Sequence, residues 1–329
     1  MAEAHDSSHA AGGSPVPVSA DNFTRAESDL YFGNIVNGDG FGKFMHIREL
    51  TPIDKQLVVR SNRDTLYSAA VFDLDAGPVT ISLPDPGGRF MSMQVITEDQ
   101  FVPAVFYGQG EHTLTRDGIG TRYVAAAIRT LVDPNDDADL DEVHALQDSI
   151  AARQDHTGTF EVPNWDPVSQ KAVRDALLQL SATLPDSKGM FGARNDTDPV
   201  RHLIGSASAW GGNPEKDAMY FSVQPTNNDG ATTYRLSVSE VPVDGFWSVT
   251  VYNKTGYFTP NFRNAYSLNN ITAQRDTDGK IVIQFGGCDD ATVNCLPITP
   301  GWNYLVRLYR PHDTVLNGEW TFPDAEPIS

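Results

Sequence analysis

Residues 75–88 read Asp75-Ala76-Gly77-Pro78-Val79-Thr80-Ile81-Ser82-Leu83-Pro84-Asp85-Pro86-Gly87-Gly88. A short strand is predicted over 79–83, because clusters of turn-forming Gly, Pro and Asp residues lie on both sides of it. The same spacing predicts further strands at 65–74, 89–97, 102–107, 112–115 and 122–132. Short strands separated by such turns are typical of an antiparallel sandwich or barrel.

The middle of the chain has helical periodicity instead. Asp139 with Glu142 predicts the capped start of one helix, Asp166-Pro167 begins a second that Pro185 ends, and a third runs from Asp198-Pro199 to about 211–212. A short helix at 24–32 precedes the strands, because Thr24 and Glu27 fit a capping box. Strand periodicity returns at 219–224, 232–241, 246–253, 280–285 and 304–310.

These patterns predict a mainly β fold with a helical insertion: two antiparallel β-sandwich domains, jelly-roll-like, bridged by helices. The expected boundaries are 23–135 for the N-terminal β domain, 136–214 for the helical bridge and 215–329 for the C-terminal sandwich. Residues 1–22 are rich in Ala, Ser, Gly, Pro and His without periodicity, so we expect a disordered arm. We interpret this arm as the segment that remains after a leader is cut away.

The charge balance argues against polyanionic partners. Lys and Arg total 24 against 43 Asp and Glu, a formal net charge of −19, whereas binding to nucleic acid depends on cations that neutralise phosphates. No apolar run approaches the roughly 20 residues that span a bilayer, so we expect neither nucleic-acid binding nor membrane insertion. The sequence leaves the oligomeric state open, a homo-oligomer included.

The two cysteines, Cys288 and Cys295, follow a predicted strand and are seven residues apart. A disulfide across this connection is geometrically reasonable and favours an oxidising compartment. The alternative is two free thiols in a cytosolic protein. The eight histidines show no metal-binding spacing, and neither a hydrolase elbow nor a dinucleotide fingerprint occurs, so we predict no metal and no cofactor.

A dense polar cluster lies at 58–68, read Val58-Val59-Arg60-Ser61-Asn62-Arg63-Asp64-Thr65-Leu66-Tyr67-Ser68. In an extended chain its residues alternate between two faces, so they meet one ligand only if the chain bends. One reading is a scaffold in which Arg60 or Arg63 pairs with Asp64. The other is a site in which Arg60, Asn62 and Arg63 bind substrate and Asp64 or Tyr67 carries a proton.

The C-terminal third adds an aromatic-rich set, most of which we expect in the sandwich core. Arg307 and Tyr309 share one strand face opposite Val306 and Leu308, which makes them further candidate binding residues.

Several motifs carry a family resemblance. Asn62-Arg63-Asp64-Thr65 with Tyr67-Ser68 resembles the signature of domain of unknown function 1254, and Gly245-Phe246-Trp247-Ser248 with Arg307-Leu308-Tyr309 resembles domain of unknown function 1214. The resemblance covers nearly the whole chain. It implies two β-sandwich domains joined by helices and an exported protein, periplasmic or secreted. It supplies no catalytic residues.

Two functional hypotheses are consistent with these patterns. The first is a protein that binds a small polar ligand, as a metal-independent hydrolase or lyase using the Arg/Asp/Tyr cluster. The second is a non-catalytic carbohydrate-binding or structural sandwich protein. Convergence of Asp64, Tyr67 and Arg307 on one cavity would favour the first.

Overall fold

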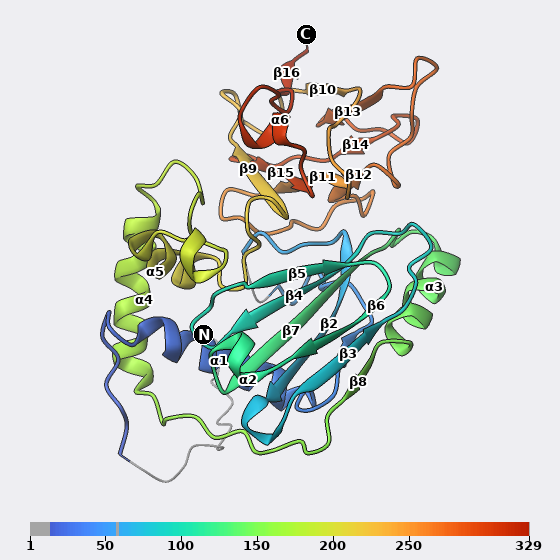
Figure 1. Cartoon of the computed structure of the whole chain (residues 1–329). Helices are drawn as coiled ribbons and strands as arrows, with labels where there is room; N and C mark the ends of the chain where they lie inside the picture. The colour runs from blue at the N-terminus through green and yellow to red at the C-terminus, as the bar shows by residue number, and fades with distance from the viewer. Residues whose placement is uncertain (1–13, 57–58, 329) are drawn as a thin grey trace. The chain divides into compact units, whose positions relative to one another are not determined.

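The computed structural model describes residues 14–56 and 59–328 (Figure 1). Strands make up 27% and helices 21% of the described residues, so the predicted mainly β class with several antiparallel sheets is confirmed. The chain divides into two compact units. Unit 1 comprises Met1–Ile47, Tyr67–Thr130 and His144–Pro214, and unit 2 comprises Arg48–Leu66, Leu131–Val143 and Glu215–Ser329. Each unit is therefore assembled from separate stretches, whereas the sequence predicted contiguous domains.

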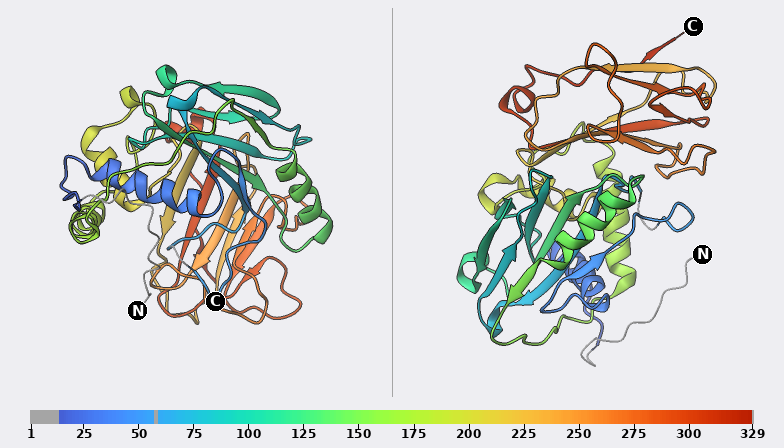
Figure 2. Two further views of the ribbon diagram at one scale, coloured as in Figure 1. Left: turned by 90° about the horizontal axis from the view of Figure 1, so that it is seen from below. Right: turned by 90° about the vertical axis from the view of Figure 1, so that its right-hand side faces the viewer.

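Unit 1 contains two sheets that share an apolar core. The larger has the order β1 (Met45–Ile47), β2 (Thr65–Asp73), β7 (Tyr123–Leu131), β4 (Met91–Thr97), β5 (Ala104–Tyr107), and the smaller the order β6 (Gly110–Leu114), β3 (Val79–Leu83), β8 (Ala151–Arg153). Alternate residues of β2 divide between the two faces of the larger sheet. Phe72 packs into the core shared with β3, whereas Val71 packs with Phe32 of helix α1 (Phe23–Asn37). Helix α1 thus covers one sheet face (Figure 2).

Within the described residues five further helices occur: α2 (Arg116–Ile119), α3 (Asp137–Asp148), α4 (Pro167–Ser181), α5 (Pro199–Ser208) and α6 (Asp313–Leu316). Two short 3-10 turns, Leu74–Ala76 and Arg194–Asp196, lie between strands and before α5. The predicted caps Asp166 and Asp198 are confirmed, since each carboxylate accepts backbone N–H bonds from the first turn of its helix.

Two predicted caps are wrong. Helix α1 begins at Phe23 without a side-chain cap, and the hydroxyl of Thr24 instead bonds Ser206 3.0 Å away. Helix α3 begins at Asp137, with Asp136 accepting from the N–H of Ala138, while Asp139 accepts from the N–H of Asp133. In both places a nearby polar group competes for the predicted cap.

Of the expected disordered arm, residues 1–13 lie outside the described residues. In the remainder Val16 forms a β-bridge with Trp165, and Val18 is buried with the core that includes Phe23. These contacts attach the segment to unit 1.

Unit 2 is built from two four-stranded layers around one core (Figure 2). The first sheet has the order β12 (Ser267–Asn269), β11 (Trp247–Tyr252), β15 (Asn303–Tyr309), β9 (Ala218–Val223), and the second β14 (Cys295–Leu296), β13 (Ile281–Phe285), β10 (Tyr234–Val238), β16 (Glu326–Pro327). Among the sheets formed by the described residues no barrel is closed. The jelly-roll arrangement of both domains stays a prediction.

The predicted disulfide is present in unit 2. Cys288 and Cys295 are bonded with their Cα atoms 5.7 Å apart, closing the connection between β13 and β14.

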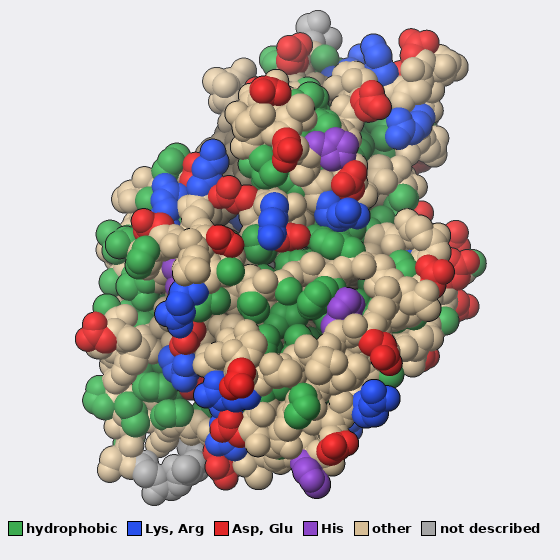
Figure 3. Space-filling view, in the orientation of Figure 1, with side chains coloured by type: hydrophobic (Ala, Val, Ile, Leu, Met, Phe, Trp, Pro, Cys, Tyr) green, Lys and Arg blue, Asp and Glu red, His purple; other side chains and the backbone are tan. Residues whose placement is uncertain are grey.

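Lys and Arg side chains are interspersed with Asp and Glu over the face shown in Figure 3. No helix in the described ranges is long and apolar enough to cross a membrane.

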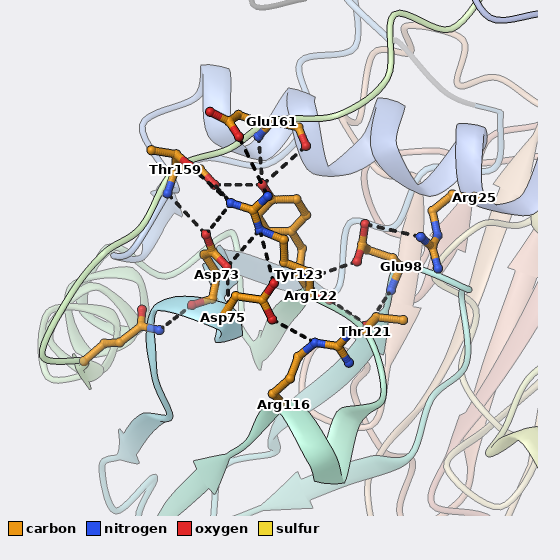
Figure 4. Close-up of polar contacts among 11 residues, drawn as sticks. Arg25, Asp73, Asp75, Glu98, Arg116, Thr121, Arg122, Tyr123, Thr159 and Glu161 are labelled. Atoms are coloured by element: carbon orange, nitrogen blue, oxygen red, sulfur yellow. Dashed lines mark hydrogen bonds and ion pairs between the residues drawn. The ribbon is translucent and has the colours of Figure 1, made fainter. Parts of the chain in front are cut away.

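A hydrogen-bonded network around Arg122 ties together the loops of unit 1 (Figure 4). Its guanidinium donates to both carboxylate oxygens of Asp73, at 3.1 and 2.9 Å, and to Thr159. Burial alone would raise the pKa of Asp73. The bonds that its carboxylate accepts from Arg122 and from the backbone N–H groups of Thr159 and Asp75 outweigh burial and hold the pKa below its ordinary value. Asp73 therefore stays ionised and paired at neutral pH.

We expect Arg122→Leu to lower the free energy of unfolding at pH 7 by about 3–5 kcal/mol, because it leaves a buried carboxylate without its cation. The Asp73 side chain is 3% exposed. A depressed pKa contributes stability above the unfolded value of about 3.9, which is lost as the pH falls through the lower folded value. Urea melts at pH 7 and pH 3 should show the difference shrinking in acid. Arg116→Leu, which breaks an exposed pair with Asp75, is the control and should cost about 1 kcal/mol or less.

Asp29 on α1 shows the opposite behaviour. Its carboxylate is buried and accepts one bond, 2.8 Å from the indole N–H of Trp165, while the other oxygen has no partner in the described part of the chain. Burial, together with the nearby Glu98 and Asp99, raises its pKa to about 7 against the opposing effects of Trp165 and Arg25. Because its pKa is raised in the folded state, Asp29 destabilises the folded protein when it is ionised and does not when it is protonated.

We expect Asp29→Asn to raise the free energy of unfolding at pH 8 by about 2–4 kcal/mol, because the wild type must ionise a buried carboxyl there. The wild-type disadvantage is absent below about pH 4 and grows as the pH rises to about 7. Thermal melts across pH 4–8 measure it, with the exposed Asp21→Asn as control. A difference that does not change with pH would contradict this assignment.

Candidate functional site

The first sheet of unit 2 has one apolar and one polar face, a consequence of strict alternation in its strands. In β11, Trp247, Val249 and Val251 belong to the core, so Ser248, Thr250 and Tyr252 point the other way. We call this side the polar face, and it comprises Ser248, Thr250, Tyr252, Ser267, Asn269, Asn303, Arg307 and Tyr309. Arg307 and Tyr309 share it opposite Val306 and Leu308, as predicted.

Arg307 is the centre of the polar face and is only 3% exposed. Its guanidinium donates to the hydroxyl of Thr250 at 2.8 Å, to the hydroxyl of Tyr252 at 2.7 Å and to the carbonyl oxygens of Arg60 and Ser61 at 2.9 and 3.4 Å. Burial by itself lowers the pKa of Arg307, but Tyr252 and Asp64 outweigh burial and raise the pKa above its ordinary value. The cation is thus held by neutral acceptors, with Asp64 as its nearby anion.

The carboxylate of Asp64 is 1% exposed and lies on the same face. Its Oδ1 accepts from the hydroxyl of Ser267 at 2.8 Å and from the amide of Asn269 at 3.2 Å. Its Oδ2 is buried and has no hydrogen-bond partner in the described ranges. Half of this carboxylate's accepting capacity is therefore unused.

One hydrogen-bond chain joins Arg307 to Asp64, and its direction is fixed. Ser267 uses its only O–H on Asp64, so in the 2.9 Å contact between Thr250 and Ser267 the donor must be Thr250. Arg307 in turn donates to Thr250. The chain therefore runs from guanidinium to carboxylate through two hydroxyls, which polarise one another in the same direction.

Ser248 is a second unsatisfied group on this face. It pairs across the sheet with Asn269 on one side and Arg307 on the other, and its hydroxyl is buried without a partner among the described residues. It therefore lies between the residue that binds Asp64 and the central cation. Sequence reasoning missed Ser248, although the alternation Ser248-Val249-Thr250-Val251-Tyr252 signals one polar strand face.

The pairing of Asp64 with Arg60 or Arg63, one of the two alternatives that the sequence left open, does not occur among the described residues. Arg60 has a left-handed backbone, φ 55°, and donates to the side chain of Asn303 at 3.0 Å. Arg63 donates to the carbonyl oxygen of Thr51 at 2.5 Å and lies over the ring of Tyr266. Burial lowers the pKa of both arginines. The chain therefore bends at Arg60. Such a bend is what the sequence required if the polar residues of 58–68 were to lie near one another.

Asn62, two residues after Arg60, contacts Tyr309 of β15. The amide of Asn62 donates to Thr65 at 3.0 Å and is 3.4 Å from the hydroxyl of Tyr309, and its oxygen accepts from the N–H of Asp64. Tyr67 belongs to unit 1, where the guanidinium of Arg129 lies 5.5 Å from its ring centroid. Val58 lies outside the described residues. Unit 2 thus gathers every predicted site residue except Tyr67.

The polar face suits hydrogen bonding to a small neutral or hydroxylated group. It offers one carboxylate oxygen and one hydroxyl with unused capacity, beside a cation that already donates to hydroxyl and carbonyl groups of the protein. Within the described ranges no group of three or more His, Cys, Asp or Glu residues is placed to hold a metal ion.

Two family models match parts of the chain, and both are described as proteins of unknown function. Residues 41–118 match the family model described as protein of unknown function (DUF1254), and residues 217–313 match protein of unknown function (DUF1214). The VPA0106 protein from Vibrio parahaemolyticus is similar in structure, with a TM-score of 0.70 and 16% identity over 94% of this chain and 98% of that one.

An uncharacterised protein from Burkholderia cenocepacia is also similar, with a TM-score of 0.50 and 12% identity over 94% of this chain and 88% of that one. No curated protein matches the chain. At these identities the likeness to solved structures shows the fold alone.

We expect Arg307→Leu to lower the free energy of unfolding by about 3–5 kcal/mol, because two buried carbonyl groups and the Tyr252 hydroxyl lose their charged donor. Urea melts followed by near-ultraviolet circular dichroism measure the change. The control is Arg235→Leu on the exposed side of β10, which should change the free energy by about 0.5 kcal/mol or less. Equal effects of the two variants would show that Arg307 does not hold the segment.

Proposed function

The chain pairs a DUF1254 domain with a DUF1214 domain, and on that premise we propose that it binds a small polar ligand at the polar face of unit 2. Asp64 and Ser248 bind the ligand directly, and Arg307 keeps the segment 60–64 in place. This is the function that the geometry of the described residues supports best.

A single observation carries the proposal. The Oδ2 atom of Asp64 and the hydroxyl of Ser248 are both buried without partners among the described residues, on one face of one sheet. A buried polar group left unpaired costs about 1–3 kcal/mol. A ligand hydroxyl that donates to Asp64, with a neighbouring oxygen that accepts from Ser248, would satisfy both.

The finer chemical hypothesis is acid–base catalysis without a metal. Asp64 would accept the proton of a ligand hydroxyl through Oδ2, as a general base in a hydrolase or lyase. Tyr67, the other proton carrier expected from the sequence, belongs to unit 1 and is not part of this proposal, whereas Arg60, Asn62 and Arg63 stay proposed substrate-binding residues. Their bonds to Asn303, Thr65 and Thr51 favour a positioning role, since each already has a protein partner.

The same proposal includes location and architecture. The disulfide between Cys288 and Cys295 supports a periplasmic or secreted protein, because such bonds persist in oxidising compartments. The two face-to-face sheets of unit 2 support the jelly-roll-like sandwich expected of this domain. We propose neither nucleic-acid binding nor membrane insertion, and a homo-oligomer stays open.

Asp64→Asn tests the site against the alternative of a structural scaffold. Asparagine keeps the oxygen that Ser267 and Asn269 bind and replaces only the unpartnered one. We therefore expect the free energy of unfolding to change by about 1 kcal/mol or less, against about 3–5 kcal/mol for a scaffold role. Urea melts measure this, and a thermal-shift screen of monosaccharides, hydroxy acids and amino acids measures binding. A ligand found with wild type should no longer raise the melting temperature of Asp64→Asn.

Ser248→Ala is the second arm of the test. Loss of an unpaired buried hydroxyl should leave stability unchanged or slightly higher, while weakening the response to the same ligand. Ser237→Ala, on the exposed side of β10, is the matched control and should leave both unchanged. A scaffold-sized loss of stability in Asp64→Asn, or a ligand response that neither variant alters, would overturn the proposed site.

A further inference from the structure

Unit 2 also has a pocket whose lining includes neither Asp64 nor Ser248. It is a pocket of about 380 Å³ formed by the loop after β11 and the residues that follow β14. All twelve lining residues are uncharged, although the chain carries a net charge of −19. Its apolar lining comes chiefly from Pro260, Phe262, Ala265, Tyr266, Pro297 and Ile298. An uncharged lining selects against charged ligands, whose desolvation would go uncompensated.

Phe262 is the unusual member of this lining. It is 71% exposed and is the only aromatic ring among the exposed large apolar side chains of the described residues. Tyr266 of the same loop is buried, as are the core rings Trp302 and Tyr304. A single exposed ring beside a neutral pocket is suited to stacking against a flat, partly apolar surface.

Polar groups in the pocket are neutral, and some keep unused capacity. The hydroxyl of Thr259 accepts from the amide of Asn253 at 3.4 Å, which leaves its own hydrogen for a ligand. The hydroxyl of Thr299 has no partner in the part of the chain that the structure describes. The oxygen of Asn261 already accepts from two backbone N–H groups, those of Arg263 and Ala265. The loop is thus fixed while two hydroxyls stay available.

The disulfide loop holds this pocket in shape. Arg263, next to Phe262, donates to the carbonyl oxygens of Asp289 and Thr292, both between the two bonded cysteines. Cys295 is also followed directly by Leu296 and the lining residues 297–299. Both walls of the pocket are therefore attached to the loop that the disulfide closes.

We propose that this pocket binds an uncharged sugar ring, with the ring of Phe262 stacked on its C–H face and the hydroxyls of Thr259 and Thr299 bonded to its hydroxyl groups. The disulfide preorganises the pocket through Arg263. A pyranose has the required chemistry: one face of C–H groups, a rim of neutral hydroxyls and no charge. The pocket shares Tyr252 with the polar face, but its lining includes neither Asp64 nor Ser248. The proposal therefore uses different binding groups from the function proposed above and can be tested apart from it.

The test is a titration of the oxidised full chain with cellobiose, maltose and methyl α-mannopyranoside, followed by saturation-transfer NMR. We expect at least one of the three to bind with a Kd of about 1–10 mM, typical of a shallow site for one ring. Phe262→Ala should weaken that binding about tenfold, whereas Phe262→Tyr, which keeps the ring, should retain it. Val293→Ala, an exposed apolar side chain of the disulfide loop outside the lining, is the matched control and should leave it unchanged.

The disulfide arm uses two variants. Cys288→Ser with Cys295→Ser should weaken binding severalfold, and Arg263→Gln should do the same with the disulfide intact, which covers the case of a double variant that does not fold. The proposal would be overturned if none of the three sugars bound at about 50 mM, or if wild type and Phe262→Ala bound them equally well. It would also be overturned if indole, titrated in the same way, bound where the sugars did not. Loss of sugar binding in Asp64→Asn but not in Phe262→Ala would assign the sugar to the polar face and overturn it as well.

Discussion

The buried guanidinium of Arg307 is the constraint on which the candidate site depends. It binds the backbone carbonyls of Arg60 and Ser61, and so holds the segment that carries Asn62 and Asp64 against the sheet. Backbone carbonyls bound in this way fix the main chain, whatever side chains the segment carries. The left-handed turn at Arg60 brings the carbonyls into reach. Asp64 then meets Ser267 and Asn269, and the polar face is complete except for two unpaired atoms.

The contrast with unit 1 shows why those two atoms matter. Around Arg122, Asp73 receives bonds to both oxygens, so the network is satisfied from within and has a structural explanation. Asp64 receives bonds to one oxygen only, although it is equally buried. Native structures satisfy most buried polar groups. An exception that involves a carboxylate and a neighbouring hydroxyl therefore points to a missing partner more strongly than a dense polar sequence does.

The sequence predicts the fold class and the strand positions well because alternation and turn residues are local signals. It also predicts the Asp166 and Asp198 caps, the disulfide and the shared face of Arg307 and Tyr309. It does not predict that residues 48–66 and 131–143 join unit 2, because such exchange depends on long-range contacts. The partners of Arg60 and Arg63 were unpredictable for the same reason: carbonyl and amide acceptors lie on distant loops, whereas the adjacent Asp64 is the obvious choice by sequence. Phe262 gave no signal, because an exposed and a buried phenylalanine look alike in a sequence.

The two units use their arginines differently, and this separates their responses to acid. In unit 1, Arg25, Arg122 and Arg174 pair with carboxylates that protonation would neutralise. In unit 2, Arg63, Arg263 and Arg307 hold loops through backbone carbonyl oxygens, which do not titrate. Arg310, in contrast, pairs with Asp244 on the surface of unit 2. Protonation of carboxylates thus removes the ion pairs of unit 1 while leaving these bonds of unit 2 intact. The segment of the candidate site is held by the bonds of Arg307 to the carbonyl oxygens of Arg60 and Ser61. Its position does not depend on a direct ion pair with Asp64, which leaves the carboxylate available for the ligand that we propose.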